Sequence, residues 1–139
     1  MSLTNALAIG SEALKQIIDH AYAEYPYEVC GLMGGHDYTV EIAAHIPNAS
    51  LTPHTAFELE RQAMVDQIVA FQRDNQEVVA IYHSHPNGSA DPSERDIAEA
   101  TWPDAVYVII GLGDLETPDV RAWTLRDGEV EPVEITLID

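Results

Sequence analysis

The 139-residue chain has little of three things that mark large classes of protein: cysteine, positive charge and long apolar runs. Its single cysteine, Cys30, cannot form an internal disulfide, so nothing supports a secreted, disulfide-stapled fold. The longest apolar run, Ala105–Leu112, is too short to cross a bilayer. Residues 1–9 lack the basic segment that begins a signal peptide. These absences favour a cytoplasmic protein.

Positive charge is scarce because Lys15 is the only lysine, and 24 acidic side chains outnumber 6 basic ones. The formal net charge of −18 repels phosphate backbones and anionic lipid, so we expect no nucleic-acid and no membrane partner. An acid-rich surface suits a high-salt cytoplasm, where ions screen the self-repulsion. It also suits a basic partner. The sequence leaves both explanations open, together with the oligomeric state.

The composition that remains is that of a globular protein, with 46% hydrophobic and 22% charged residues. No linker or repeat divides the chain, so we expect one domain over residues 1–139. The patterns predict an α+β fold, a mixed sheet flanked by two or three helices. The predicted strands are Leu3–Ile9, Glu28–Met33, Tyr38–Ile46, Val78–Tyr82, Val106–Gly111, Arg121–Leu125 and Val130–Leu137. The predicted helices are Ser11–Glu24 with Ser11 as N-cap, Phe57–Asp74, and Ser93–Ala100 with Ser93 or Pro92 as N-cap.

The segment that carries chemistry begins where the predicted central strand ends. His83 and His85 are two residues apart, so on a strand they point to the same face. After a loop, Asp96 falls in the first turn of the next helix. Two imidazoles and a carboxylate fill three of the four tetrahedral positions of zinc and leave one for water, as in a catalytic site. By chance this spacing, with Ser93 included, is expected in roughly one such chain in a thousand.

The motif His-x-His, seven residues, then Ser-x-x-Asp resembles that of the JAMM (MPN+) metalloproteases, matched here by His83, His85, Ser93 and Asp96. The family's Glu-x-Cys-Gly-x-x-x-Gly context is matched by residues 28–35. The resemblance implies a JAMM/MPN core, which is cytidine-deaminase-like, and it extends over nearly the whole chain. The chain is most similar to short, stand-alone prokaryotic members that cleave ubiquitin-like or sulfur-carrier proteins. Some details also resemble RadC-like proteins, but the Glu-x-Cys-Gly segment favours the peptidase branch.

The resemblance also implies roles for these residues. One Zn2+ per chain, held by His83, His85 and Asp96, polarises the scissile carbonyl and carries the hydrolytic water. Glu28 takes the proton of that water as general base and passes it to the leaving amine. Ser93 stabilises the oxyanion, although its hydroxyl has a competing use as a helix N-cap. The substrate is then an amide at the C-terminus of a ubiquitin-like or sulfur-carrier protein.

Two other classes of function stay open at this stage. One is an MPN-fold scaffold or binding module, although such a module has no need of the complete set of five residues. The other is a zinc hydrolase of a small amide or a modified cysteine in sulfur metabolism.

No His or Cys follows Asp96, which argues against a second zinc and against linkage specificity of the eukaryotic kind. Cys30 is expected to pack as a small buried hydrophobe rather than act as a nucleophile. Four further histidines have no partner at ligand spacing and are left unassigned: His20, His36, His45 and His54.

Overall fold

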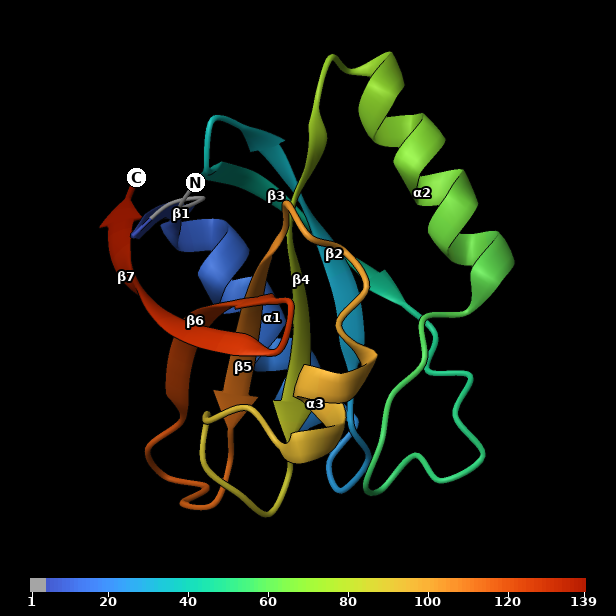
Figure 1. Cartoon of the computed structure of the whole chain (residues 1–139), viewed down its shortest axis with the longest axis vertical. Helices are drawn as coiled ribbons and strands as arrows, with labels where there is room; N and C mark the ends of the chain where they lie inside the picture. Colours follow the sequence, from blue (N-terminus) through green and yellow to red (C-terminus); the bar gives the residue numbers. More distant parts are fainter. Residues whose placement is uncertain (1–4) are drawn as a thin grey trace.

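The computed structural model describes residues 5–139 and contains seven strands and three helices in these residues (Figure 1). Of the first predicted strand, residues 3–4 lie outside the described residues. None of the described helices is long and apolar enough to cross a membrane. The strands are β1 (Ala6–Gly10), β2 (Cys30–His36), β3 (Thr39–Ile46), β4 (Glu77–His85), β5 (Val106–Gly111), β6 (Asp119–Arg126) and β7 (Glu129–Ile138). The helices are α1 (Ser11–Ala23), α2 (Arg61–Arg73) and α3 (Glu94–Glu99).

The strands form one mixed sheet that closes into a barrel in the order β1-β3-β2-β4-β5-β6-β7. β1 runs parallel to both β3 and β7, and β4 runs parallel to β5, whereas the remaining neighbours are antiparallel. The predicted mixed sheet is therefore confirmed. Closure was not predicted, because it depends on β1 pairing with β7 from the opposite end of the chain.

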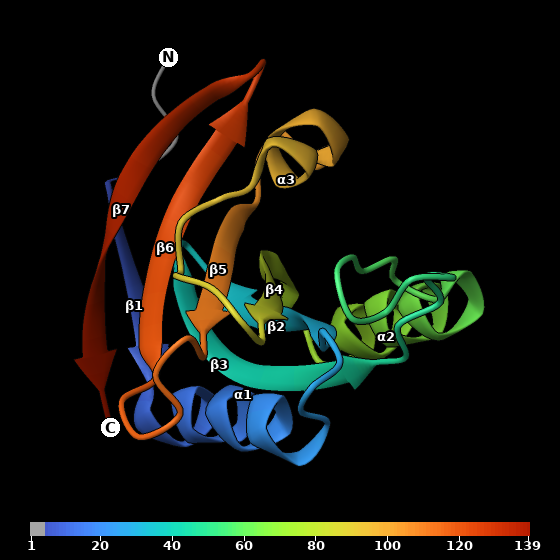
Figure 2. The ribbon, with the colours of Figure 1, turned by 90° about the horizontal axis from the view of Figure 1, so that it is seen from below.

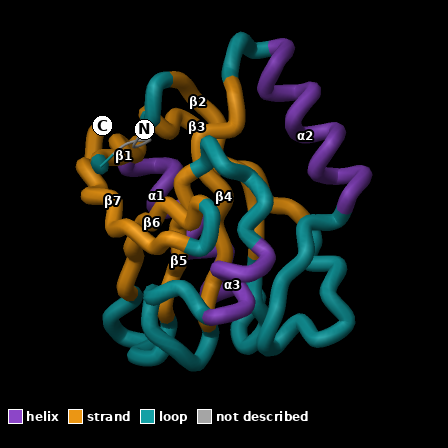
Figure 3. Tube along the Cα trace, viewed as in Figure 1, coloured by secondary structure: helices purple, strands orange, loops and turns teal. Residues whose placement is uncertain are grey.

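The core has two parts because the central strands are buried on both faces. Tyr82 of β4 belongs to a cluster that includes Ala13, Ile17 and Ala21 of α1. Its neighbour Ile81 belongs to a second cluster, against which the apolar residues of α2 pack. α1 and α2 accordingly lie on different sides of the sheet (Figure 2). The long loops gather with α3 at one end of the barrel, where β4 ends (Figure 3).

The predicted start of the second helix is wrong. α2 begins at Arg61, and Glu60 is its N-cap, accepting hydrogen bonds from the N–H groups of Gln62 at 3.1 Å and Ala63 at 2.6 Å. Phe57 therefore lies in the preceding loop rather than on the apolar stripe of the helix. It is free to contact the end of β4 instead.

Smaller boundaries also differ from the prediction. β4 runs on to His85 instead of ending at Tyr82, so both candidate histidines lie within the strand. Ser11 is the first helical residue of α1, whose N-cap is Gly10, and no side chain caps this end. Glu28 precedes β2 instead of lying in it, since the strand begins at Cys30. Tyr38 has a φ of 57° in a left-handed turn, so β3 begins one residue later. Ser93 is confirmed as the N-cap of α3.

Candidate metal centre

Three side chains from the end of β4 and the start of α3 converge on one point. The Nε2 atoms of His83 and His85 are 3.1 Å apart. The two carboxylate oxygens of Asp96 lie 3.1 Å from Nε2 of His83 and 3.0 Å from Nε2 of His85. Among residues 5–139 this is the one group of at least three His, Cys, Asp or Glu side chains close enough to hold a metal ion. The structure thus brings together the three residues that the spacing predicted as ligands.

The hydrogen-bonding chemistry of His85 fits a metal at this point. Its Nδ1 lies 2.8 Å from the carbonyl oxygen of Ser89, which can only accept, so Nδ1 must carry a hydrogen. In the neutral ring, Nε2 then presents a lone pair toward His83 and Asp96. A metal ion at this point would be coordinated by two imidazole nitrogens and a carboxylate, which are ligands that zinc prefers. The three residues could therefore hold zinc.

His83 is held differently. Its side chain is fully buried, and its ring stacks on Phe57 with centroids 4.3 Å apart and 22° between the planes. The Nδ1 atom of His83 has no hydrogen-bond partner among the described residues. Packing against Phe57, rather than a hydrogen bond at the second nitrogen, thus orients this imidazole. The sequence pattern predicts a different role for Phe57, because its apolar side chain fits the helical stripe that follows.

Asp96 is prepared for ligation by the helix that carries it. Ser93 and Asp96 form a capping box: the Asp96 N–H donates to Ser93 Oγ at 3.0 Å, and the Ser93 N–H donates to Asp96 Oδ2 at 2.9 Å. Burial raises the pKa of Asp96, but the facing His83 and His85 rings and the N–H of Ser93 outweigh it and hold the pKa far below its ordinary value. Asp96 is therefore a carboxylate over the whole working range of pH.

The position of Ser93 reconciles its two possible uses. As N-cap, its oxygen accepts one hydrogen bond, which uses a lone pair and leaves the hydroxyl hydrogen. That hydrogen is donated to no other described residue. Ser93 also lines the cleft beside Asp96. Its hydroxyl can therefore cap α3 and donate a hydrogen bond into the cleft at the same time.

Glu28 lies in the loop that precedes β2 and is held beside β4 through the backbone. The N–H of the next residue, Val29, donates to Oγ of Ser84 at 2.9 Å, and the Ser84 N–H donates to Val29 O at 3.1 Å. Ser84 is the residue between the two histidines, so one side chain joins the Glu28 loop to the ligand strand. Sequence reasoning missed this role, which only the pairing of β2 with β4 could show.

The carboxyl group of Glu28 is buried, with 7% of the residue exposed, and no described residue donates a hydrogen bond to it. Burial raises the pKa of Glu28 to about 7, with a smaller opposing effect from His85. A carboxyl group with a pKa near neutrality is suited to take up and release protons at physiological pH. The physical state of Glu28 therefore agrees with that of a general base.

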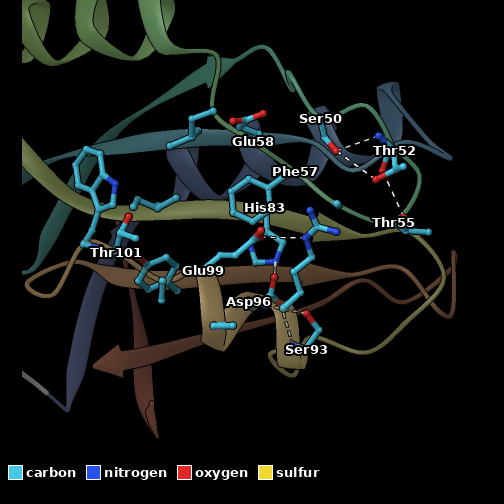
Figure 4. A pocket seen from close by; sticks show the side chains of 18 of the residues that line it. Ser50, Thr52, Thr55, Phe57, Glu58, His83, Ser93, Asp96, Glu99 and Thr101 are labelled. Atoms are coloured by element: carbon cyan, nitrogen blue, oxygen red, sulfur yellow. Dashed lines mark hydrogen bonds and ion pairs between the residues drawn. The ribbon is translucent and has the colours of Figure 1, made fainter. Parts of the chain in front are cut away.

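Two of the three candidate ligands, His83 and Asp96, line a cleft of about 920 Å³ together with Ser93, between α3 and the loop at residues 48–60. Figure 4 shows Phe57 against His83, with Asp96 and Ser93 on the α3 side and Ser50 and Thr52 in the opposite loop. The far end of the cleft is apolar and includes Trp102. The cleft is therefore long enough for an extended segment of chain to reach the candidate metal centre.

Cys30 is fully buried, and burial together with the charge of Glu28 raises the pKa of its thiol to about 12. A thiol that stays protonated is a poor nucleophile, so the predicted packing role is confirmed. Two of the unassigned histidines, His20 and His45, stack on each other with centroids 3.7 Å apart. Nδ1 of His20 lies 2.8 Å from the hydroxyl of Tyr82. These rings have structural contacts away from the cleft.

The fold and the donor set together define a class: a barrel of the JAB/MPN type that carries a His-His-Asp group at the end of a buried strand. The chain belongs to the family of prokaryotic homologs of the JAB domain, whose family model matches residues 10–126. The resemblance in the sequence motif is therefore confirmed.

Named relatives cover most of the chain. A CysO-cysteine peptidase of Mycobacterium tuberculosis is 32% identical over 133 residues, which are 93% of this chain and 90% of that protein. A probable TtuB-protein conjugate cleaving protease of Thermus thermophilus is 39% identical over 116 residues, 84% of this chain and 74% of that protein.

Solved structures confirm the fold. Protein DSY2949 of Desulfitobacterium hafniense superimposes with a TM-score of 0.87 at 25% identity, covering 96% of this chain and 93% of that one. A structure described as a JAMM metalloprotease-like zinc site in the proteasome and signalosome superimposes with a TM-score of 0.58 at 20% identity. This second superposition covers 94% of this chain and 98% of the other, so the structural likeness extends over the whole domain.

Proposed function

We propose that this chain is a zinc-dependent peptidase that hydrolyses amide bonds at the C-terminus of ubiquitin-like or sulfur-carrier proteins. The observation that carries the proposal is the convergence of His83, His85 and Asp96 on one point next to a cleft, with the buried Glu28 near enough to interact electrostatically with His85 and Asp96. Residues 1–139 would form the whole catalytic unit, because one barrel supplies every one of these groups.

Each residue would have one chemical task. His83, His85 and Asp96 would hold a zinc ion, which when bound supplies Lewis acidity to water and to the scissile carbonyl. Glu28 would remove a proton from the attacking water as the new C–O bond forms. Ser93 would donate its free hydroxyl hydrogen to the carbonyl oxygen as negative charge develops there. Glu28 would then deliver the proton to the amine as the C–N bond breaks.

The cleft supports an extended peptide as substrate. The segment at residues 57–59 lines it, and the backbone N–H and C=O groups of Phe57 and Leu59 are bonded to no other described residue. Asn48 and Leu59 lie opposite each other, but the backbone hydrogen bonds between these two segments are made by their neighbours, from the Ala49 N–H to Glu58 O and from the Glu60 N–H to Pro47 O. The backbone N–H and C=O groups of Leu59 therefore face away from Asn48. A free edge of this kind can pair with an incoming strand. The named relatives are a CysO-cysteine peptidase and a probable TtuB-protein conjugate cleaving protease, and a C-terminal protein tail in this position fits activities of that kind.

The test combines metal content with turnover. We expect about one zinc per chain in the purified protein by mass spectrometry, and its loss in Asp96→Ala. Glu28→Gln should keep its zinc and lose at least about a hundredfold in kcat, because it removes the base and not a ligand. The substrates are carrier proteins that end in Gly-Gly, one extended by a single amino acid and the other joined to a lysine side chain.

The outcomes separate the proposal from its two rivals. Zinc without cleavage of either carrier substrate, but with hydrolysis of a short amide, would favour the small-amide hydrolase. Absence of zinc even after reconstitution would contradict the proposal and leave the scaffold as the better explanation. Undiminished kcat in Glu28→Gln would refute only the role of Glu28 as general base and would leave the rest of the proposal standing.

A further inference from the structure

The side chain of Asn48 uses its entire hydrogen-bonding capacity on backbone groups around the candidate site. Its Nδ2 donates to the carbonyl oxygens of Glu28 at 2.9 Å and Ala56 at 3.0 Å. Its Oδ1 accepts from the N–H groups of Ser50 and Glu58, both at 3.0 Å. A carboxamide has two donor hydrogens and two acceptor lone pairs, so none is left over. One side chain thereby joins the Glu28 loop to the loop that lines the cleft.

The contacts of Asn48 matter because the Glu28 side chain has no hydrogen bond of its own among the described residues. The place of its carboxyl group is therefore set by its backbone. On one side Ser84 fixes the neighbouring Val29 to the ligand strand. On the other side the Glu28 N–H donates to Pro53 O at 2.7 Å, and the Glu28 carbonyl oxygen accepts from Asn48. Asn48 thus supplies the only side-chain hydrogen bond to the backbone of Glu28 itself in residues 5–139.

We propose that Asn48 is a positioning residue, whose carboxamide sets the distance of the Glu28 carboxyl from the metal centre and the cleft. The inference rests on the proposed function, in which Glu28 is the base. A base acts only within hydrogen-bond reach of its proton, and a displacement near 1 Å can cost about a hundredfold in rate. Without the two donor hydrogens of Asn48, the Glu28 loop is held on this side by the Pro53 contact alone.

The rival role for Asn48 is to shape only the cleft wall, through Ser50, Ala56 and Glu58. A residue that shapes the wall alone changes substrate binding whether or not Glu28 is present. A residue that acts through Glu28 loses its effect when Glu28 has already been removed. A double-mutant cycle measures this difference directly.

The cycle uses the zinc-loaded full chain and a carrier–peptide fusion as substrate. Asn48→Ala should lower kcat by about 10- to 100-fold with unchanged zinc content. In the Glu28→Gln background the same substitution should lower kcat by less than about threefold. Equal losses in both backgrounds would overturn the proposal. Where the residual turnover of Glu28→Gln is too slow to measure, amide hydrogen exchange at Glu28 and Val29 decides between the two roles.

Two controls separate positioning from stability. Val133→Ala removes buried volume from β7, which contributes no residue to the cleft, so it should lower Tm while kcat stays unchanged. Asn48→Asp keeps the two acceptor contacts and loses both donors, so its kcat should fall at least as far as that of Asn48→Ala. It also serves as the test variant if Asn48→Ala does not fold.

A readout independent of turnover keeps this inference distinct from the proposed function. Amide hydrogen exchange at Glu28 and Val29 should be faster in Asn48→Ala than in the wild type, and unchanged in Val133→Ala. Unchanged exchange at these amides in Asn48→Ala would overturn the positioning role. A zinc-loaded wild type that cleaves neither carrier substrate would instead contradict the proposed function, and the exchange measurement would still test the contact.

Discussion

At the scale of single residues, the candidate site contains a group, Glu28, that suits the proposed reaction but lowers the stability of the folded protein. Glu28 is buried without a hydrogen-bond donor, and a buried carboxylate of this kind costs stability. Its position in the loop before β2 is held from outside, by Ser84 and Asn48. We infer that this part of the chain gives up stability to place a base with a pKa near neutrality beside the metal centre.

Glu28→Gln should therefore stabilise the metal-free protein, in a pH-dependent manner. The pKa of Glu28 is raised from 4.5 in the unfolded chain to about 7 in the folded protein. Its contribution to stability is fully present below pH 4.5 and is lost as pH rises to about 7, whereas glutamine does not titrate. The variant should gain roughly 3 kcal/mol over the wild type at pH 8 relative to pH 4.

Urea denaturation of both proteins in excess chelator, at several pH values between 4 and 8, measures this difference. A stability difference that stays constant across that range would show that Glu28 titrates normally in the folded protein. A second comparison is between Asn48→Ala and the double variant that also carries Glu28→Gln. The pH-dependent difference between these two should be smaller, because the loosened loop of Asn48→Ala should admit water to Glu28.

At the scale of elements, the ligand strand depends on close packing between β2, β3 and β4. A Cβ atom on Gly31 of β2 would overlap the ring of Tyr82 in β4 and the carbonyl oxygen of Ala44 in β3. Tyr82 is fully buried, immediately precedes His83, and contacts His20 of α1 through its hydroxyl. The space that Gly31 leaves therefore lets α1 and β4 meet next to the metal ligands.

Gly31→Ala should destabilise the protein by about 3 kcal/mol, because the overlapping atoms belong to backbone and to a ring with no room to turn. Thermal unfolding measures the loss, which should come with weaker zinc binding as Tyr82 displaces His83. Gly10→Ala is the matched control, since a Cβ there would lie at an ordinary 3.5 Å from Val40 O. Similar Tm values for the two variants would contradict this account of β2.

The elements that sequence patterns predicted well are those with strong local signals. The strand Val106–Gly111 is confirmed at both ends, and the first helix is confirmed to within a residue, since each has a continuous apolar pattern. The second helix was extended to Phe57 because an aromatic residue at helical spacing looks like part of a stripe. Its contact with His83 is long-range and leaves no periodic signal.

At the scale of the whole molecule, the dominant feature is a net charge of −18. The ion pairs that Lys and Arg make in residues 5–139 are exposed, such as Lys15 with Asp19 at 2.8 Å and Arg95 with Glu99 at 3.0 Å. Exposed pairs of this kind contribute little to stability. Most acidic side chains therefore repel one another across the surface without compensation.

Salt should accordingly stabilise the folded protein. We expect Tm to rise as KCl increases from 0.05 to 0.5 M, because the Debye length falls below the spacing of surface charges over this range. Differential scanning calorimetry of the metal-free protein measures the effect, with sucrose of equal osmolality as the uncharged control. A Tm that falls, or that does not respond to KCl, would contradict self-repulsion as a limit on stability.

The family and the candidate ligands His83, His85 and Asp96 can be predicted from the sequence, because the three residues lie at one strand end and the following helix start, where local spacing sets their geometry. The surroundings of these ligands depend on long-range packing. Closure of the barrel joins β1 to β7, and the loop contacts of Asn48 hold Glu28, from another part of the chain, near the ligands. Such contacts follow from how distant segments pack, and packing of this kind leaves no pattern in the local sequence.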